Sequence, residues 1–556
     1  MYTKPLSAVG KYIPHRPIGL KDRTWPDQRP SAAPRWCSVD LRDGNQALLD
    51  PMDIERKIKL FNLLVQLGFS EIEVGFPTAS KAEWDFLREL ARRELVPEQV
   101  TVQIMSPMRA DHIERSVESL AGIPKAIVQI YNPISPVQRA DVFGMSRAEI
   151  KAMAVGGAQV VLDLREKCTD TLLSLQYGAE SFTQTEPEFA LEVCNAVLET
   201  WAPRPGDDVR INLPATVEAF PPQEFGDRIE WMHRNLLYRD EILLSVHPHN
   251  DRGTAVAATE IAVLAGADRV EGTLFGNGER TGNVCLITLA MNLFTQGIEP
   301  GLDLSHIDDI RRVAEECTGI AVHPRHPWAG DLVYTSFAGS HQDAISKTLV
   351  ARAREESKAW DIPYLPVDPS DVGRSYSALV RINSQSGKGG ISYLLKTNYG
   401  IEMPRRLQID FSAHVQSHID EHGGEMTAVF LLKLFESEYE DQQPSGQGAR
   451  PLFDLDLDRL EPGAVVPDFL GPGGPSGQVV SLTTQALESG VGPDKMVTTA
   501  FHRCYCEIAT AVGTVWGAGR AATARQALAW ALRASASRAS ARVASALGES
   551  APEKAW

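Results

Sequence analysis

Residues 36–76, WCSVDLRDGNQALLDPMDIERKIKLFNLLVQLGFSEIEVGF, contain the unit from which the fold is predicted. The runs WCSVDL (36–41) and EIEVGF (71–76) are short and rich in apolar and β-branched residues, as buried strands are. Between them, apolar residues recur at intervals of three and four in IERKIKLFNLLVQLG (54–68), which indicates an amphipathic helix. A strand, a helix and a second strand in this order predict a unit of a parallel sheet.

The alternation of strand and helix continues along the first half of the chain. Six further strand candidates follow: VTVQIM (100–105), AIVQIY (126–131), LLSLQY (172–177), VRINLP (209–214), ILLSVHPH (242–249) and RVEGTLF (269–275). Eight strand–helix units in about 260 residues match the size of a (β/α)8 barrel. A doubly wound open sheet is the alternative.

The predicted fold class is α/β: a (β/α)8 TIM barrel, then a helical region, then a small α+β C-terminal domain. The segment DQQPSGQGARP (441–451) is polar and rich in Gly, Pro and Gln, which favours a linker. The changes in composition predict six segments: an N-terminal arm (1–35), the catalytic barrel (36–300), helical and loop subdomains (301–440), the linker (441–451), the α+β domain (452–540) and a tail (541–556).

Patterns in the C-terminal half predict individual elements. A helical segment is expected at 404–438, and VVSLTTQALESG (479–490) also reads as helix. HRCYCEIATAVG (502–513) favours a strand, on which Cys504 and Cys506 would share one face. A zinc site is the alternative for this cysteine pair, and the lack of a second pair nearby disfavours it. An alanine-rich stretch then predicts a final helix.

Composition excludes several classes of protein. Of the 556 residues, 43% are hydrophobic and 23% are charged, which is ordinary for a globular protein. A net charge of −17 disfavours a nucleic-acid binder, and no apolar run approaches the ~18 residues of a membrane helix. The first residues, MYTKPLSAVGKYIPHRPIGL, do not resemble a signal peptide, so a cytoplasmic location is expected. The seven scattered cysteines do not form a disulfide framework.

Polar residues gather where the predicted strands end. In a (β/α)8 barrel the active site lies at the C-terminal ends of the strands, so such residues converge on one mouth. Convergence from five separate strand ends predicts a site there. The five polar segments are 40–45, 178–180, 214–216, 247–251 and 276–283.

His247 and His249 are the most informative pair at this mouth. Residues i and i+2 of a strand point to the same side, so both imidazoles can bind one metal ion. Asp43 offers a carboxylate from another strand end, and Asn283 offers an amide oxygen. This open set of nitrogen and oxygen ligands suits a divalent Zn, Mn, Co or Mg ion. Two ordinary histidines near a loop are the alternative.

Arg42 lies beside Asp43 and carries a fixed, forked cation. It could hold a substrate carboxylate or polarise a carbonyl oxygen. A salt bridge to Asp40 or Glu73 is the alternative role.

Several linked motifs resemble the 2-isopropylmalate synthase family, within the metal-dependent Claisen-type condensing enzymes. The resemblance runs from residue 12 to residue 434 and is most like the long form of the family. The motifs that carry it are WCSVDLRDGNQA (36–47), SVHPHNDRGTA (245–255), GNGERTGN (276–283), GSHQDA (339–344) and VGR (372–374).

The resemblance implies a reaction, the first committed step of leucine biosynthesis. A 2-oxo acid, usually 3-methyl-2-oxobutanoate, chelates a divalent metal (Mg, Mn or Zn). A base removes a methyl proton from acetyl-CoA, the enolate attacks the 2-oxo carbonyl, and the thioester is hydrolysed. The implied metal ligands are Asp43, His247 and His249, with Asn283 as an outer or fourth ligand, and Arg42 helps to stabilise the alkoxide.

The resemblance also implies further roles. Glu180 and His341 match the pair used for proton transfer, Thr216 matches a substrate contact, and Gly278 and Glu279 match the loop on the coenzyme A side. The segment with His341 reaches into the partner subunit's site in this family, which implies a homodimer. The family's C-terminal domain binds leucine, and the corresponding part of this chain is shortened, so leucine as an effector stays open.

Two positions depart from the family pattern. Gln129 stands where the family usually has His, and Gly178 stands where it usually has Ser. Both positions line the family's pocket for the 2-oxo acid, so a bulkier or more polar 2-oxo acid is an alternative substrate. Two other functions remain open: a carbon–carbon lyase of the same superfamily, and a non-catalytic amino-acid sensor.

Overall fold

The chain forms two compact units, and each is described separately. One comprises Met1–Val333 with Asp371–Gly373, and the other comprises Tyr334–Ser370 with Arg374–Trp556. The computed structural model describes residues 11–13, 15–353, 359–374, 388–423, 426–440, 461–462, 465–466, 477–487, 501–510, 513–521 and 524–546.

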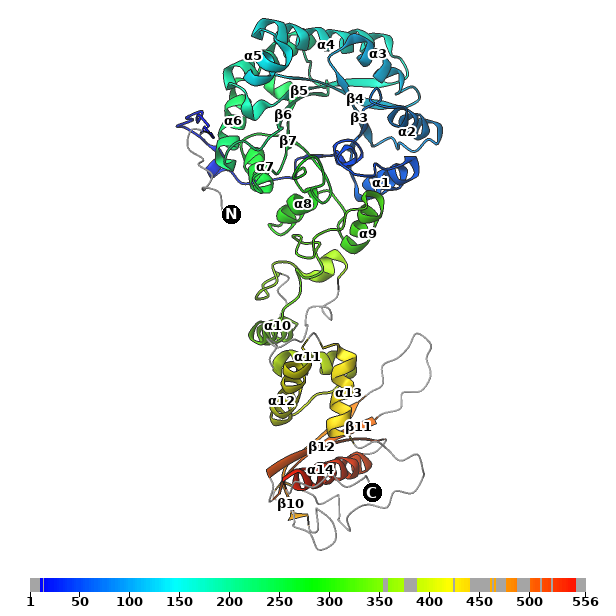
Figure 1. Ribbon diagram of the computed structural model, residues 1–556, viewed down its shortest axis with the longest axis vertical. Helices are drawn as coiled ribbons and strands as arrows, with labels where there is room; N and C mark the ends of the chain where they lie inside the picture. Colours follow the sequence, from blue (N-terminus) through cyan, green and yellow to red (C-terminus); the bar gives the residue numbers. More distant parts are fainter. Residues whose placement is uncertain are drawn as a thin grey trace, which may run out of the picture. The chain divides into compact units, whose positions relative to one another are not determined.

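The first unit is a closed barrel of parallel strands (Figure 1). Each strand pairs with the next along the chain, and β1 pairs with β8 to close the ring. The predicted barrel is therefore confirmed, and the open-sheet alternative is wrong. The strands are β1 (Arg35–Ser38), β2 (Glu71–Gly75), β3 (Thr101–Pro107), β4 (Lys125–Pro133), β5 (Leu172–Glu180), β6 (Val209–Ala215), β7 (Ile242–Pro248) and β8 (Arg269–Gly272).

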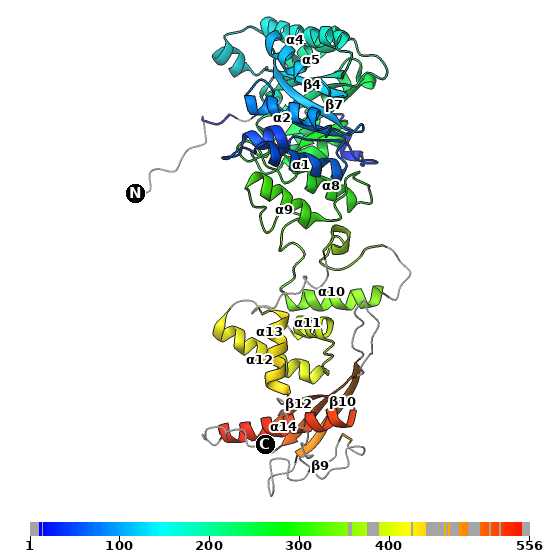
Figure 2. The ribbon, with the colours of Figure 1, turned by 90° about the vertical axis from the view of Figure 1, so that its right-hand side faces the viewer.

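Helices surround the barrel on the outside (Figures 1 and 2). The first shows how local sequence defines them: Asp53 accepts a hydrogen bond from the Arg56 amide at its start, and Gly68 ends it at φ 99°. The α-helices of this unit are α1 (Ile54–Leu67), α2 (Lys81–Arg92), α3 (Ala110–Glu118), α4 (Arg147–Lys167), α5 (Pro187–Trp201), α6 (Pro222–Asn235), α7 (Ala255–Leu264), α8 (Leu286–Phe294) and α9 (Ile307–Thr318).

Short helical turns connect several of these elements. One of them, η2, is a π-helical turn that follows β1 directly and carries Arg42 and Asp43. The turns are η1 (Trp25–Asp27), η2 (Asp40–Gly44), η3 (Gln138–Phe143), η4 (Phe182–Gln184), η5 (Arg239–Glu241) and η6 (Pro369–Val372).

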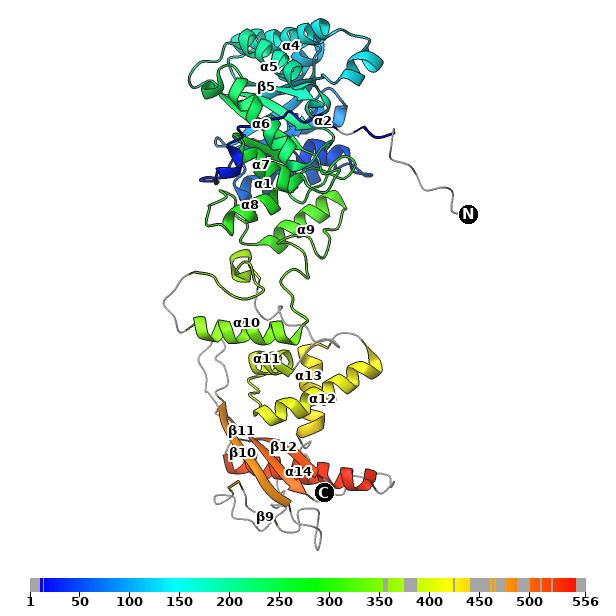
Figure 3. The ribbon, with the colours of Figure 1, turned by 90° about the vertical axis from the view of Figure 1, so that its left-hand side faces the viewer.

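The second unit contains helices followed by a small sheet. The sheet order is β12-β11-β10-β9, with antiparallel pairs throughout. Helix α14 lies along one face of it (Figure 3), where Ala527 and Ala531 pack against Cys504 and Cys506. The elements are α10 (Gly339–Arg352), α11 (Lys388–Tyr399), α12 (Arg405–His422), α13 (Ala428–Tyr439), β9 (Val465–Val466), β10 (Gly477–Leu487), β11 (Phe501–Thr510), β12 (Gly513–Ala521) and α14 (Ala524–Ala546).

Several predictions for this unit can be compared with the structure. The strand predicted within 502–513 is confirmed over 502–510, which belong to β11, with both of its cysteines in one buried cluster, and the alanine-rich helix is α14. The helical segment at 404–438 consists of two helices, because α12 ends at His422. The linker (441–451) lies outside the described residues.

The helix predicted over 479–490 is wrong, because its first nine residues belong to strand β10. A β-bulge explains the error: the register with β11 shifts between Val479 and Ser481. The extra residue lets Val479 and Leu482, three apart, pack against the same apolar cluster. The spacing of three that suggests a helix is thus produced by an irregular strand.

No helix of the described part of the chain is long and apolar enough to cross a membrane.

Candidate metal and active site

Three buried side chains at the mouth of the barrel form a cluster with metal-binding geometry. Asp43 lies on η2, His247 near the end of β7, and His249 just beyond it. Asp43 Oδ2 is 3.2 Å from His247 Nε2 and 3.6 Å from His249 Nε2. One ligand atom from each residue lies within 4.8 Å of the others. The structure therefore brings together the three side chains that the strand periodicity and the family motifs single out.

Unpartnered atoms around the cluster also fit a cation. The Oδ1 atom of Asn283 and the Nδ1 atom of His249 are buried and have no hydrogen-bond partner among the described residues. Asn283 pairs with His249 in an isolated β-bridge, and its Nδ2 donates to the Asn277 carbonyl at 3.0 Å. The Asn283 oxygen is thus left as an acceptor without a donor. Two imidazoles, a carboxylate and an amide oxygen form a suitable donor set for a divalent ion.

The three side chains of the cluster differ in the direction in which their pKa values are shifted. Burial alone would lower the pKa of His247, but hydrogen bonds to Asp43 and Glu271 raise it to about 9. Burial and the nearby His247 lower the pKa of His249 to about 4. Burial opposes the charge of Asp43, yet Arg42 and His247 hold the pKa of its carboxyl well below the usual range. A carboxylate that stays ionised beside a neutral imidazole is what a metal ion requires.

Gly278 is needed for the position of Asn283. Its φ is 150°, and a Cβ at Gly278 would lie 2.2 Å from Asn283 Nδ2. The adjacent Glu279 accepts a 3.5 Å hydrogen bond from Gln46, whose Nε2 also donates to Asp43 at 2.8 Å. Both loop residues therefore lie beside the cluster, while their assignment to the coenzyme A side stays a prediction.

Arg42 is buried and held by two carboxylates. Its Nε donates to Glu73 at 2.6 Å, and its Nη1 is 3.4 Å from Asp43 Oδ1. The salt bridge to Glu73 that the sequence left as an alternative therefore exists. Asp40 instead accepts hydrogen bonds from Ser38 and the Leu274 amide. These contacts fix the guanidinium and leave its Nη2 without a partner among the described residues.

Glu180 ends strand β5 and is partly buried at the mouth. Burial raises the pKa of its carboxyl, and the positive charge of Arg42 opposes this shift. Thr216, the residue after β6, accepts a 2.9 Å hydrogen bond from the amide of Ser181, the residue that follows Glu180. The structure thus places Glu180, Thr216 and Arg42 around one opening.

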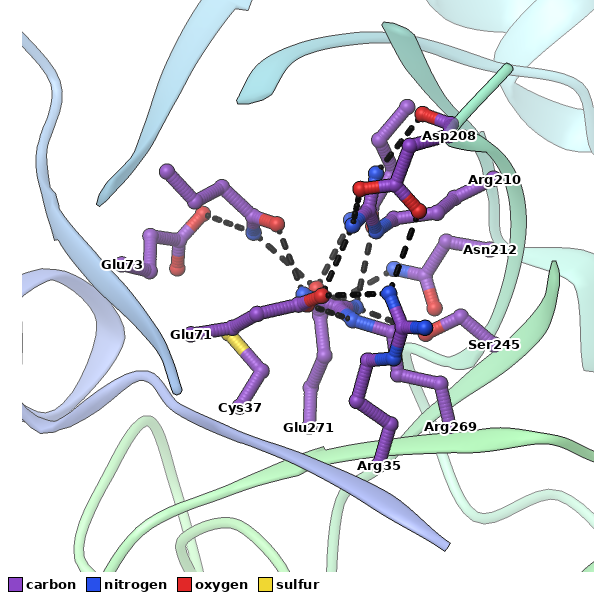
Figure 4. A network of polar contacts seen from close by, with 12 residues as sticks. Arg35, Cys37, Glu71, Glu73, Asp208, Arg210, Asn212, Ser245, Arg269 and Glu271 are labelled. Carbon is purple, nitrogen blue, oxygen red and sulfur yellow. Dashed lines mark hydrogen bonds and ion pairs between the residues drawn. The ribbon is translucent and has the colours of Figure 1, made fainter. Parts of the chain in front are cut away.

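Buried charged side chains form a network inside the barrel (Figure 4), and Glu271 connects this network to His247 of the cluster. His247 Nδ1 contacts Glu271 Oε2 at 2.8 Å, and Arg269 Nη1 donates to Glu271 Oε1 at 2.7 Å. Arg269 on β8 and Arg210 on β6 both donate to Glu71 on β2. We call this group the floor: Glu71, Glu73, Gln103, Gln176, Arg210, Arg269 and Glu271.

Sequence reasoning missed the floor. The signal was present, since charged residues alternate with apolar ones in EIEVG and RVEG. Such alternation normally indicates a solvent-facing side of a strand. Here that side faces the interior of a closed barrel.

The remaining predicted residues lie in two places. Gln129, on β4, accepts hydrogen bonds from Gln103 at 2.7 Å and Gln176 at 2.5 Å, at the upper edge of the floor. Gly178 lies within β5 rather than after it. His341 belongs to the second compact unit, where its ring stacks on Tyr364 with the centroids 3.8 Å apart. Its role at the mouth stays a prediction.

Comparison with known proteins agrees with this geometry. A family model described as HMGL-like matches residues 33–314, which include the whole barrel. A second model, described as alpha-isopropylmalate synthase, post-catalytic domain-like, matches residues 331–396. The barrel and its cluster therefore define an enzyme of the HMGL-like class.

Curated relatives narrow the assignment. The chain is 55% identical over 450 residues to a 2-isopropylmalate synthase of Parafrankia sp., covering 81% of this chain and 79% of the relative. It is 55% identical over 429 residues to that of Ralstonia nicotianae, with 77% and 74% covered, and 54% identical over 430 residues to that of Rhodospirillum rubrum, with 77% of each covered. The chain belongs to the 2-isopropylmalate synthase family.

Proposed function

We propose that this chain is an acyltransferase that condenses acetyl-CoA and water with 3-methyl-2-oxobutanoate to give 2-isopropylmalate and coenzyme A. The observation that carries the proposal is the buried cluster of Asp43, His247 and His249 beside Arg42, in a member of this family. The names of the relatives favour condensation over the lyase alternative. Ligand atoms without partners do not fit a sensor that has lost its site.

The proposed role of the metal ion is to polarise a carbonyl oxygen of the substrate. When bound by Asp43, His247 and His249, with Asn283 beside them, a divalent ion acts as a Lewis acid toward a carbonyl oxygen. Members of the HMGL-like family are metal-dependent and use acetyl-CoA. The choice among Mg, Mn and Zn belongs to the proposal, because the donor set accommodates each of them.

Arg42 supplies a fixed cation for the charge that develops on the 2-oxo carbonyl oxygen. Glu73 and Asp43 hold its Nε and Nη1, so the free Nη2 can donate to the oxygen without reorganisation. A preorganised donor in a buried site stabilises the developing alkoxide more than a solvated one would. Thr216 supports the same opening by fixing the Ser181 amide next to Glu180.

Proton transfer is the proposed task of Glu180 and His341. One of them accepts a methyl proton from acetyl-CoA, and the resulting carbanion forms a carbon–carbon bond to the 2-oxo carbonyl carbon. The alkoxide takes a proton, and water then cleaves the thioester to release the coenzyme A thiol. Burial raises the pKa of Glu180, which makes its carboxylate a stronger base than an exposed glutamate.

The resemblance supports three finer proposals. The chain is proposed to form a homodimer in which His341 serves the partner's site, since the post-catalytic match includes this residue. Leucine is proposed as an effector of the small sheet domain, and Gly278 and Glu279 are proposed to face coenzyme A. A cytoplasmic location stays a prediction of the N-terminal sequence.

Thiol release tests the proposed function directly. The metal-loaded protein should release coenzyme A from acetyl-CoA only when 3-methyl-2-oxobutanoate is present, with 2-isopropylmalate identified by mass spectrometry. Equal release without the 2-oxo acid, or no release with any 2-oxo acid, would contradict the proposal.

A further inference from the structure

Arg280 joins the loop that carries Asn283 to the ends of two other strands. Its Nε donates to Asp251 Oδ1 at 2.7 Å, and its Nη2 donates to Asp251 Oδ2 at 3.1 Å. The same Nη2 donates to the backbone carbonyl of Thr216 at 2.5 Å. Thr216 follows β6 and Asp251 follows β7, whereas Arg280 lies on the loop after β8. One guanidinium therefore connects three consecutive strand ends at the mouth.

The loop itself is a tight turn that ends at Asn283. Its two ends are in contact, since a Cβ at Gly282 would lie 1.8 Å from the carbonyl oxygen of Gly276, and the φ of Gly282 is 91°. Arg280 lies between these glycines, so its side chain anchors the whole turn on the side of β6 and β7. On the side of β1, Asn277 Nδ2 donates to a carbonyl of η2 at 2.9 Å.

Thr216 links Arg280 to the strand end that carries Glu180. The backbone carbonyl of Thr216 accepts from Arg280, and its Oγ1 accepts from the Ser181 amide at 2.9 Å. Ser181 directly follows Glu180, the last residue of β5. The loop beside the metal cluster and the strand end with the proposed base are therefore both held by Thr216.

The backbone of Arg280 indicates a role besides stability. Arg280 and Ser181 adopt left-handed conformations, with φ 57° and 63°, which cost free energy for a residue with a Cβ. The side chain of Arg280 is 42% exposed, and an ion pair at such a position contributes little to stability. Stability alone therefore does not explain why two strained residues bond to Thr216. Strained backbone of this kind is concentrated where the geometry of a functional site is fixed.

From these contacts we infer that Arg280 is a positioning residue for the proposed condensation. It holds Asn283 beside the metal ligands and, through Thr216, it holds Glu180 in a fixed place relative to them. The inference rests on the proposed function and adds a residue to it. A displacement of about 1 Å between reacting groups can lower a rate about a hundredfold, so a residue that does not touch the substrate can still control the rate.

Two substitutions separate the side chain of Arg280 from its backbone. Arg280→Ala and Arg280→Gly both remove the guanidinium, but only glycine adopts the left-handed conformation without strain. Arg280→Gly should melt about 2 °C above Arg280→Ala. In both, kcat and kcat/KM for thiol release should fall equally, by about 10–100-fold, because positioning acts in the transition state. Recovery of kcat in Arg280→Gly would mean that only the backbone matters and would overturn the inference.

Titration of the metal-free protein with Mn²⁺ keeps the test independent of turnover. Looser placement of Asn283 should weaken Mn²⁺ binding about tenfold in both variants of Arg280. Unchanged affinity would overturn the link between Arg280 and the metal site. Absence of thiol release from the unmodified chain with every 2-oxo acid would contradict the proposed condensation, and the titration would still decide whether Arg280 positions the loop.

Glu94 provides the matched control. It follows α2, is exposed, and is also left-handed, with φ 52°. Glu94→Gly should melt above Glu94→Ala by the same margin as at Arg280, while kcat and Mn²⁺ affinity stay unchanged. A loss of kcat in the variants of Glu94 would show that a change of strain anywhere in the barrel disturbs the site, and it would overturn the inference.

Discussion

The mouth and the floor of the barrel are both polar, but their polar atoms are paired differently. In the floor, the carboxylates of Glu71 and Glu271 receive hydrogen bonds from buried arginines and glutamines. At the mouth, Asn283 Oδ1 and His249 Nδ1 are buried without partners among the described residues. The difference indicates that the floor maintains the shape of the barrel, while the mouth keeps its atoms available for a ligand.

Removing a mouth residue should have the largest effect on turnover. His247→Ala deletes a metal ligand, and we expect metal loss and at least about a thousandfold lower kcat/KM, since a Lewis acid contributes several kcal/mol. Metal content by mass spectrometry and thiol release measure the two effects. His422→Ala, at an exposed position of α12, is the matched control. Normal metal content in His247→Ala would remove His247 from the site.

Removing a floor residue should instead act mainly on stability. Glu271→Ala removes one of the two carboxylates that hold the buried Arg269, so the free energy of unfolding should fall by about 3–5 kcal/mol in urea. Glu271→Gln keeps the shape and should weaken metal affinity about tenfold through the contact with His247. Glu98→Ala, at an exposed position, should change neither quantity. A stable Glu271→Ala protein would show that the floor is not a structural network.

A third measurement tests whether a single chain supplies all the catalytic residues at the mouth of its barrel. If Glu180 and His341 act from different subunits, mixed dimers of Glu180→Gln and His341→Ala contain one intact site. Random mixing should then restore about a quarter of the unmodified activity. Each variant alone should remain inactive at every protein concentration. Mixed dimers that are shown to form but stay inactive would refute the shared site.

The smallest expected effect is a change in stability at Asp40, a buried acid whose hydrogen-bond partners are neutral. Asp40, on η2, accepts hydrogen bonds from Ser38 and the Leu274 amide, and burial raises the pKa of its carboxyl from 3.8 to about 6. Because the folded pKa is raised, the charged form costs stability above pH 6, and this cost fades as the pH falls toward 4. Asp40→Asn should therefore gain about 1–2 kcal/mol at pH 7 and little at pH 4. The exposed Asp141→Asn is the control, and a gain independent of pH would contradict the shift.

The sequence was sufficient for the barrel and for the cluster at its mouth. Strand–helix alternation predicts parallel strands, and their C-terminal ends meet, so Asp43, His247 and His249 could be placed together without coordinates. The family motifs added Glu180, which lies at the same opening.

The floor and strand β10 show where such reasoning failed. Glu71 contacts Arg210 and Arg269 across the barrel, over separations of 139 and 198 residues, and no local pattern reports such a pairing. In β10 a bulge after Val479 imitates helical spacing. Local periodicity predicts an element and its exposed face only when the element is regular and its polar face contacts solvent.

The shared acceptor Glu71 has a consequence for how this barrel can change over generations. Two buried arginines share this carboxylate, so replacing Glu71 removes one carboxylate partner from both at once. A single substitution at Glu71 is therefore expected to disturb several contacts of the floor. At Gly178, by contrast, a Cβ would meet its neighbours only at ordinary contact distances, so this position can be exchanged by itself. Substitutions near the mouth can therefore change the substrate preference while the residues of the floor stay the same.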